Sequence, residues 1–260
     1  MKPLAGIRIA VTRPAHQSAE LAAPLEAAGA TVHICPLIRA EPTVDAAQWN
    51  RVKSELHEYA WIVFTSTNGV EHFAALLRDG DMQIAELDNA RVACVGPATA
   101  KSAEAHGFRV SLVPDQFLGT VVADALAEAG AVSGRKILLA RAGGGGAELP
   151  ARLKGRGAVV EDLELYRSVP DDDGTARLRL LLGRSEVDVL TFTSGSAVTY
   201  FVEQIGHPAK MVVAVIGPST AHVARKLGLR VDLEADPHTS AGMIQAITDY
   251  YAARRGKSEV

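Results

Sequence analysis

The heptapeptide FTSTNGV at residues 64–70 recurs as FTSGSAV at residues 192–198, 128 positions further along the chain. The same shift aligns the N-terminal segment with the middle of the chain, where it matches polar residues as well as apolar ones, such as Arg13 with Arg141. Every βα unit needs an apolar strand, a turn and an amphipathic helix, so apolar matches alone are expected without duplication. Polar identities held in one register favour an internal duplication.

Secondary structure follows one pattern along the chain, in which short runs rich in Val and Ile alternate with Ala- and Leu-rich segments of helical period. That alternation is typical of βα units built around parallel sheets. A duplicated chain of this kind predicts two similar α/β lobes, each a parallel sheet flanked by helices, with a cleft between the lobes. Strands are expected at residues 7–12, 31–35, 61–65, 91–95, 109–113, 136–140, 159–163, 187–191, 211–216 and 230–233.

Composition and charge narrow the class of protein. The 260 residues are 48% hydrophobic, enough for the cores of two ordinary domains. A net charge of −3 argues against binding nucleic acid by general electrostatics. Residues 1–6 lack the apolar core of a secretory signal, and no apolar run approaches the roughly 18 residues of a membrane span. We therefore expect a soluble cytoplasmic protein, with Cys35 and Cys94 buried as small hydrophobic residues.

Three kinds of strand-to-helix turn each occur twice. The first kind contains Arg13 or Arg141, the second is the FTS motif, and the third is VGPATA from Val95 or IGPSTA from Ile216. All lie at the carboxyl end of a predicted strand, where open α/β sheets bind ligands. One Ser/Thr turn is more often only a helix cap, but matched turns in both halves favour two sets of anion-binding turns built from amides and helix dipoles.

The arginine turns leave two interpretations open. A guanidinium at Arg13 or Arg141 could bind a carboxylate in bidentate fashion, or it could simply lie along the surface. The glycine run at residues 143–146 lacks the Lys-Ser/Thr ending of a phosphate loop and the spacing of a dinucleotide fingerprint. We interpret it as a flexible loop at the mouth of the cleft.

Tyr166, in the segment ELYRS, is the remaining candidate for proton chemistry. The eight histidines are scattered without metal-ligand spacing, and the sequence has neither a Gly-x-Ser-x-Gly elbow nor an active-site cysteine signature. On the residues alone, packing of the ring with the hydroxyl bonded to structure is the better interpretation of Tyr166.

The order and spacing of these segments resemble the uroporphyrinogen-III synthase family from residue 7 to about residue 250. The marks of the resemblance are Thr-Arg-Pro after the first strand, FTSTNGV, VGPATA, the Arg141 turn, LELYRS, FTSGSAV and IGPSTA. The duplication alone would suggest that each repeat forms one lobe. The resemblance implies a different arrangement, in which the chain crosses between the lobes twice. The first lobe then takes residues 1–35 and 168–260, the second takes 42–162, and 36–41 with 163–167 form a two-stranded connector that serves as hinge.

The resemblance also implies a substrate and a reaction. Hydroxymethylbilane, an anionic linear tetrapyrrole, would be cyclised to uroporphyrinogen III with loss of water and inversion of the last pyrrole ring through a spiro intermediate, without a metal or organic cofactor. It makes Tyr166 the expected general acid that helps the hydroxyl leave as water. The turns are expected to bind the substrate carboxylates through Thr12, Arg13, Ser66, Asn68, Gly96, Thr99, Arg141, Ser194, Ser196, Gly217 and Thr220.

Two alternatives share these features. A non-catalytic two-lobed sensor or binding module for a small carboxylate would need the same cleft, hinge and anion-binding turns. A phosphate-handling doubly wound enzyme is less favoured, because the lysine and acidic partners of such sites are missing. The sequence requires nothing beyond a monomer, and neither nucleic acid nor a membrane is an expected partner.

Overall fold

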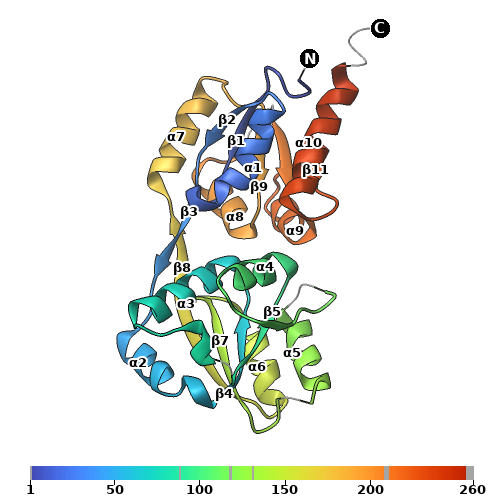
Figure 1. Cartoon of the computed structure of the whole chain (residues 1–260). Helices are drawn as coiled ribbons and strands as arrows, with labels where there is room; N and C mark the ends of the chain where they lie inside the picture. The colour runs from blue at the N-terminus through green and yellow to red at the C-terminus, as the bar shows by residue number, and fades with distance from the viewer. Residues whose placement is uncertain (1, 88, 117–118, 131, 208–210, 256–260) are drawn as a thin grey trace. The chain divides into compact units, whose positions relative to one another are not determined.

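The computed structural model describes residues 2–87, 89–116, 119–130, 132–207 and 211–255, and the chain forms two compact units. Unit 1 consists of Met1–Arg39 and Val169–Val260, and unit 2 is Ala40–Ser168. Each unit is an α/β domain in which helices flank a mainly parallel sheet (Figure 1). The predicted fold class is therefore confirmed.

The sheet of unit 1 is five-stranded, and all its described strand pairs are parallel. Its order is β11 (Leu233–Glu234), β10 (Val212–Val215), β9 (Val189–Phe192), β1 (Arg8–Val11) and β2 (Thr31–Ile34). The central strands β9 and β10 are buried at every position, because helices cover both faces of the sheet.

Two helix layers enclose that sheet. Helices α1 (Ala15–Ala27) and α10 (Ser240–Arg255) cover one face, where Leu21 and Met243 belong to the same core cluster. Helices α7 (Asp172–Gly183), α8 (Gly195–Gln204) and α9 (Pro218–Lys226) contribute to the cluster on the other face.

The sheet of unit 2 is six-stranded and follows the same plan. Its order is β3 (Ile38–Pro42), β8 (Val159–Pro170), β7 (Lys136–Ala142), β4 (Tyr59–Phe64), β5 (Arg91–Cys94) and β6 (Val110–Leu112). One core cluster includes residues of α2 (Ala46–Ser54), α3 (Thr67–Asp79) and α4 (Pro97–Ala105). The other includes residues of α5 (Gly119–Glu128) and α6 (Glu148–Gly155), and the short 3-10 helices are η1 (Leu56–Glu58) and η2 (Ile84–Leu87).

Each strand expected from the sequence is present, with ends shifted by a few residues. The largest difference is β8, which was expected to end at Leu163 and instead continues to Pro170. The segment after Leu163 is extended because it pairs with β7 as far as Tyr166. This extension places Tyr166 inside a strand.

Both cysteines are buried and free, as the sequence predicted. Burial raises the pKa of the Cys35 thiol to about 11 and that of the Cys94 thiol to about 12. Both therefore remain thiols at neutral pH and behave as packing residues.

Candidate functional site

The strand-to-helix turns gather in two sets, one in each unit. In unit 2 they follow β7, β4 and β5, which are neighbours in the sheet, and in unit 1 they follow β1, β9 and β10, which are also neighbours. Because the described pairs among these strands are parallel, the turns of each set share one sheet edge. Each set combines turns from both sequence repeats, since the chain crosses between units within the repeats.

The serines of the FTS motifs cap helices. The Ser66 hydroxyl oxygen accepts a hydrogen bond from the Gly69 amide at 3.1 Å at the start of α3. Ser194 accepts from the Ala197 amide at 3.3 Å at the start of α8. These contacts satisfy orphan amides of the first helical turn.

Both units have the serine caps, but unit 2 differs from unit 1 in having Tyr166 beside its cap. The Tyr166 hydroxyl lies 2.9 Å from the Ser66 hydroxyl, and its ring packs in the core with only 4% of the residue exposed. The His72 ring stacks on the phenol with centroids 5.0 Å apart and planes inclined by 20°. These contacts match the interpretation from sequence alone, in which the Tyr166 ring packs and its hydroxyl bonds to structure. The hydroxyl that bonds to Ser66 also lies at the sheet edge that bears the turns.

A β-bulge in β8 places the Tyr166 side chain at this position. The β7–β8 pairing passes from Arg141 opposite Glu164 to Ala142 opposite Tyr166, which leaves Leu165 as the extra residue on β8. Regular alternation would send Leu165 and Tyr166 to opposite faces of the sheet. The bulge instead places both in one core cluster, alongside α3.

The pKa of the Tyr166 phenol is raised, chiefly by burial and also by the charge of Glu71. Hydrogen bonds to Ser66 and Asn68 lower this pKa in part. The phenol is therefore protonated at neutral pH, the form that a general acid requires. A proton donor flanked by a hydroxyl and an amide is suited to assisting the departure of a hydroxyl group as water.

The Arg141 guanidinium is bonded to other groups of unit 2. Its Nε and Nη2 donate to the two carboxylate oxygens of Asp162, both at 2.7 Å, and its Nη1 donates to the Gly146 carbonyl at 3.1 Å. The residue is 7% exposed, and the hydrogen bonds to Asp162 raise the pKa of its guanidinium. The charge of Arg141 is balanced internally by Asp162, and a contact of its guanidinium with a substrate carboxylate stays a prediction.

The glycine run at residues 143–146 is tied at both ends. The Gly143 amide donates to the Tyr166 carbonyl at 2.6 Å, and the Gly146 carbonyl accepts from Arg141. A Cβ at Gly145 would lie 2.4 Å from Arg141 Nη1, so the loop follows the guanidinium closely. These contacts hold the ends of the loop, and its expected flexibility stays a prediction.

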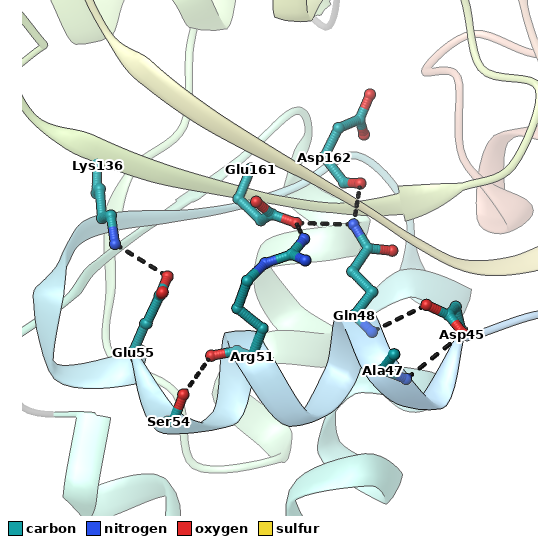
Figure 2. A network of polar contacts seen from close by, with 9 residues as sticks. All are labelled: Asp45, Ala47, Gln48, Arg51, Ser54, Glu55, Lys136, Glu161 and Asp162. Carbon is teal, nitrogen blue, oxygen red and sulfur yellow. Dashed lines mark hydrogen bonds and ion pairs between the residues drawn. The ribbon is translucent and has the colours of Figure 1, made fainter.

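A polar network holds the strand segment that carries Asp162 (Figure 2). Gln48 on α2 donates to the Glu161 carboxylate at 2.8 Å and to the Asp162 carbonyl at 2.9 Å, and Arg51 donates to Glu161 at 2.8 Å. Asp45 caps the same helix. The segment of β8 leading to Tyr166 is thus anchored to α2 as well as to β7.

In unit 1, Thr12 is fully buried, and its hydroxyl donates to the Thr191 carbonyl at 2.6 Å. That contact links β1 to β9 and uses the Thr12 hydroxyl as a donor within the fold, so its contact with a ligand stays a prediction. Arg13 differs, because it contacts the exposed Glu20 carboxylate at 3.0 Å and Ser240 at 3.4 Å. Among the described residues its buried Nε has no hydrogen-bond partner.

The Gly-Pro turns have matching backbone roles. Gly96 and Gly217 are the N-caps of α4 and α9, and a proline occupies the first turn of each helix. Thr99 and Thr220 are buried in those first turns, at 7% and 4% exposure. His238 packs on Gly217, since a Cβ there would lie 3.0 Å from the imidazole. Ser196 is exposed, and its hydroxyl lies 3.2 Å from that of Ser194.

A cavity of about 280 Å³ lies at the carboxyl ends of β4 and β7, lined by residues that include Thr65, Arg141, Gly146 and Glu148. A larger one of about 590 Å³ lies at the far end of α3, where Arg78 and His106 line it. The larger cavity is remote from the turns at the strand ends. The smaller cavity lies at the sheet edge that bears the turns of unit 2, but neither Ser66 nor Tyr166 is among its lining residues.

Sequence reasoning did not find His72 or Asp162. Asn68 and His72 are four residues apart on α3 and so share a helix face, but no residue pattern shows that this face meets Tyr166. Asp162 lies two residues before Glu164 in a strand segment, and nothing in that segment marks it as a partner of an arginine. Only the neighbouring strand shows that it pairs with Arg141.

Comparison with known proteins gives concordant matches. A family model described as "Uroporphyrinogen-III synthase HemD" matches residues 19–245. The uroporphyrinogen-III synthase of Chlorobaculum parvum is 28% identical over 93% of this chain and 98% of its own, and a putative one from Methanothermobacter thermautotrophicus is 31% identical over 92% and 96%.

Solved structures share the fold. A mutant uroporphyrinogen III synthase from Thermus thermophilus superposes with a TM-score of 0.67 at 20% identity, covering 96% of this chain and all of its own. The Helicobacter pylori uroporphyrinogen-III synthetase superposes with a TM-score of 0.61 at 16% identity, covering 94% and 99%. At these identities the structural likeness bears on the fold alone.

Proposed function

This chain belongs to the uroporphyrinogen-III synthase family, and we propose that it cyclises hydroxymethylbilane to uroporphyrinogen III in porphyrin (haem) biosynthesis. It is then a lyase that removes water. The observation that carries the proposal, beyond the family match, is the Tyr166 hydroxyl held 2.9 Å from Ser66 at the sheet edge that also bears the turns of unit 2.

Loss of the terminal hydroxyl of the substrate as water requires one proton donor. Tyr166 gives its phenol proton to the terminal hydroxyl of the substrate, the C–O bond breaks, and water leaves. The electrons of the neighbouring pyrrole produce an azafulvene cation, which the substituted α-carbon of the last ring attacks to give the spiro intermediate. Fragmentation and reclosure invert that ring, and loss of a ring proton restores aromaticity. That ring proton returns to the Tyr166 phenolate, so one water leaves overall and the phenol is regenerated.

Orientation is the larger task, because closure without inversion competes with the spiro route. The substrate carboxylates suit first-turn amides, hydroxyls and the Arg13 guanidinium. Of the residues expected from sequence, we retain Arg13, Asn68, Gly96, Thr99, Ser194, Ser196, Gly217 and Thr220 as proposed contacts. The domain map of 1–35 with 168–260 and of 42–162, with 36–41 and 163–167 as hinge, is part of the same proposal.

The protein is further proposed to be a cytoplasmic monomer. None of the helices in the described part of the chain has the length and apolar character needed to span a membrane. Light scattering coupled to size exclusion tests the oligomeric state. A mass of twice the 27.4 kDa of the chain would overturn the monomer.

Incubation with freshly prepared hydroxymethylbilane, followed by oxidation and separation of the porphyrin isomers, tests the function. We expect the type III isomer to dominate with the wild-type protein. A product that contains only the uninverted type I isomer, at the rate seen without protein, would reject the synthase and favour the carboxylate sensor.

A further inference from the structure

Helix α3 holds the phenol of Tyr166 through two side chains of different kinds. Ser66, the N-cap residue, reaches the hydroxyl, and His72 in the second turn stacks on the ring. We propose that Ser66 and His72 are positioning residues for the acid step, Ser66 by donating a hydrogen bond to the Tyr166 oxygen and His72 by fixing the plane of the ring. The proposal deepens the proposed function and rests on it.

The bonding of Ser66 favours donation. Its oxygen already accepts the Gly69 amide at 3.1 Å, and its remaining proton lies within reach of the Tyr166 oxygen at 2.9 Å. If Ser66 donates, the Tyr166 proton is not used in the bond to Ser66 and is available for another acceptor. Once that proton has left, the phenolate can only accept hydrogen bonds, so Ser66 is then necessarily the donor.

Several groups face the phenol. Ser66, Asn68, Glu71 and His72 all come from α3. Burial and Glu71 disfavour a phenolate here, whereas Ser66 and Asn68 favour it. The positive end of the α3 dipole lies at its N-terminus beside the same hydroxyl, and it also favours the anion. The helix therefore offsets part of the burial that would otherwise make the phenol a poor acid.

Unit 1 lacks this arrangement. The shift of 128 that aligns Ser66 with Ser194 places Ile38 opposite Tyr166. Ile38 packs against the core of unit 1, and the Ser194 hydroxyl contacts Ser196 instead of a phenol. The capping serine is therefore common to both units, and its contact with a phenol is found in unit 2.

The experiment compares two variants of nearly equal shape. Ser66→Asn and Ser66→Asp both retain an oxygen that caps α3, but Asn has N–H donors and ionised Asp has none. For each we measure kcat, the ratio of type III to type I product, and the ionisation of Tyr166 by NMR of ¹³Cζ-labelled tyrosine, with the signal assigned from Tyr166→Phe. Asp45→Ala, which removes the cap of α2 in the same unit, controls for the cost of a lost cap.

We expect Ser66→Asp to raise the pKa of Tyr166 and to lower kcat by about tenfold, part of the roughly 10² to 10⁴ that a general acid supplies. Ser66→Asn should stay within about threefold of wild type. His72→Ala should lower kcat, and His72→Phe, which retains a stacking ring, should restore it.

Wild-type Tyr166 ionisation and kcat in Ser66→Asp would overturn the role of Ser66, and wild-type kcat in His72→Ala would overturn that of His72. If the wild-type protein makes no type III isomer, the proposed function fails. The NMR titration still decides whether Ser66 controls the Tyr166 phenol, so the two failures are distinguishable.

Discussion

Arg141 and Asp162 form a bidentate ion pair across β7 and β8, in which Nε and Nη2 each donate to a separate carboxylate oxygen at 2.7 Å. The arginine at the matching place in the other repeat, Arg13, has no such arrangement, because the residue equivalent to Asp162 is Ile34. Duplicated arginines have therefore diverged. Arg141 holds a loop and a strand together, whereas Arg13 pairs with an exposed carboxylate, that of Glu20.

Arg141→Gln should lower the free energy of unfolding by about 1.5–3 kcal/mol, because it leaves Asp162 without its charged partner. Arg13→Gln, the matched control, should cost less than about 1 kcal/mol, since its partner Glu20 is exposed. Urea denaturation measures both. Arg13→Gln should instead raise KM for hydroxymethylbilane, and a KM effect confined to Arg141→Gln would contradict this division of roles.

Tyr166→Phe should reduce kcat by about 10² while the fold is retained, because the ring still packs against His72 and only the hydroxyl is lost. Turnover assays and circular dichroism test the two parts. A folded variant with wild-type turnover would remove Tyr166 from the mechanism.

Gly174→Ala should destabilise unit 1 by at least about 1–3 kcal/mol. A Cβ at Gly174 would lie 1.9 Å from the Pro36 carbonyl oxygen, and backbone on both sides prevents an easy adjustment. Gly183→Ala, in the same helix but with open space around it, should be neutral or slightly stabilising. Thermal unfolding of the two variants should separate them, and equal melting temperatures would refute the close approach of α7 to Pro36.

Stability in acid should depend on Asp188. Arg8 donates to it from Nε and Nη2 at 2.9 and 2.7 Å and from its amide at 2.8 Å, and these hydrogen bonds hold the pKa of the Asp188 carboxyl below its ordinary value. The stabilisation is therefore present above the unfolded pKa of about 3.9 and is lost as pH falls through the lower folded value.

Asp188→Asn should accordingly cost about 1–2 kcal/mol at pH 7, and the difference from wild type should shrink below about pH 4. Denaturation at several pH values measures it, with Asp115→Asn, at an exposed carboxylate, as control. A difference that stays constant down to pH 2 would show that the carboxylate charge is not responsible.

Substrate binding should be distributed over the turns. Ser194→Ala and Thr220→Ala should each weaken binding by only about 0.5–2 kcal/mol, because backbone amides and the helix dipoles remain. Loss of all activity on one such substitution in a folded protein would contradict distributed binding. Measuring KM for hydroxymethylbilane in each single variant tests this prediction.

Much of the fold is readable from residue order alone. The central strands of both sheets are buried on two faces, so they read as short apolar runs, and their turns carry the Ser, Thr, Gly and Pro that helix starts require. Ser66 and Ser194 were recognisable as caps for that reason. These are local consequences of sequence, and the duplication repeats them.

The contacts that define the candidate site are not local. Ser66 and Tyr166 are 100 residues apart, and the strand order β8–β7–β4 together with a bulge at Leu165 brings them together. Thr12 and Arg141 were expected at a ligand and proved to be bonded to Thr191 and Asp162. Sequence determined which segments become strands, helices and turns, because local propensity and burial pattern suffice for that. Tertiary structure decided which polar groups satisfy one another and which remain for a ligand, because a hydrogen-bond donor is committed only when strand order and register place an acceptor within reach.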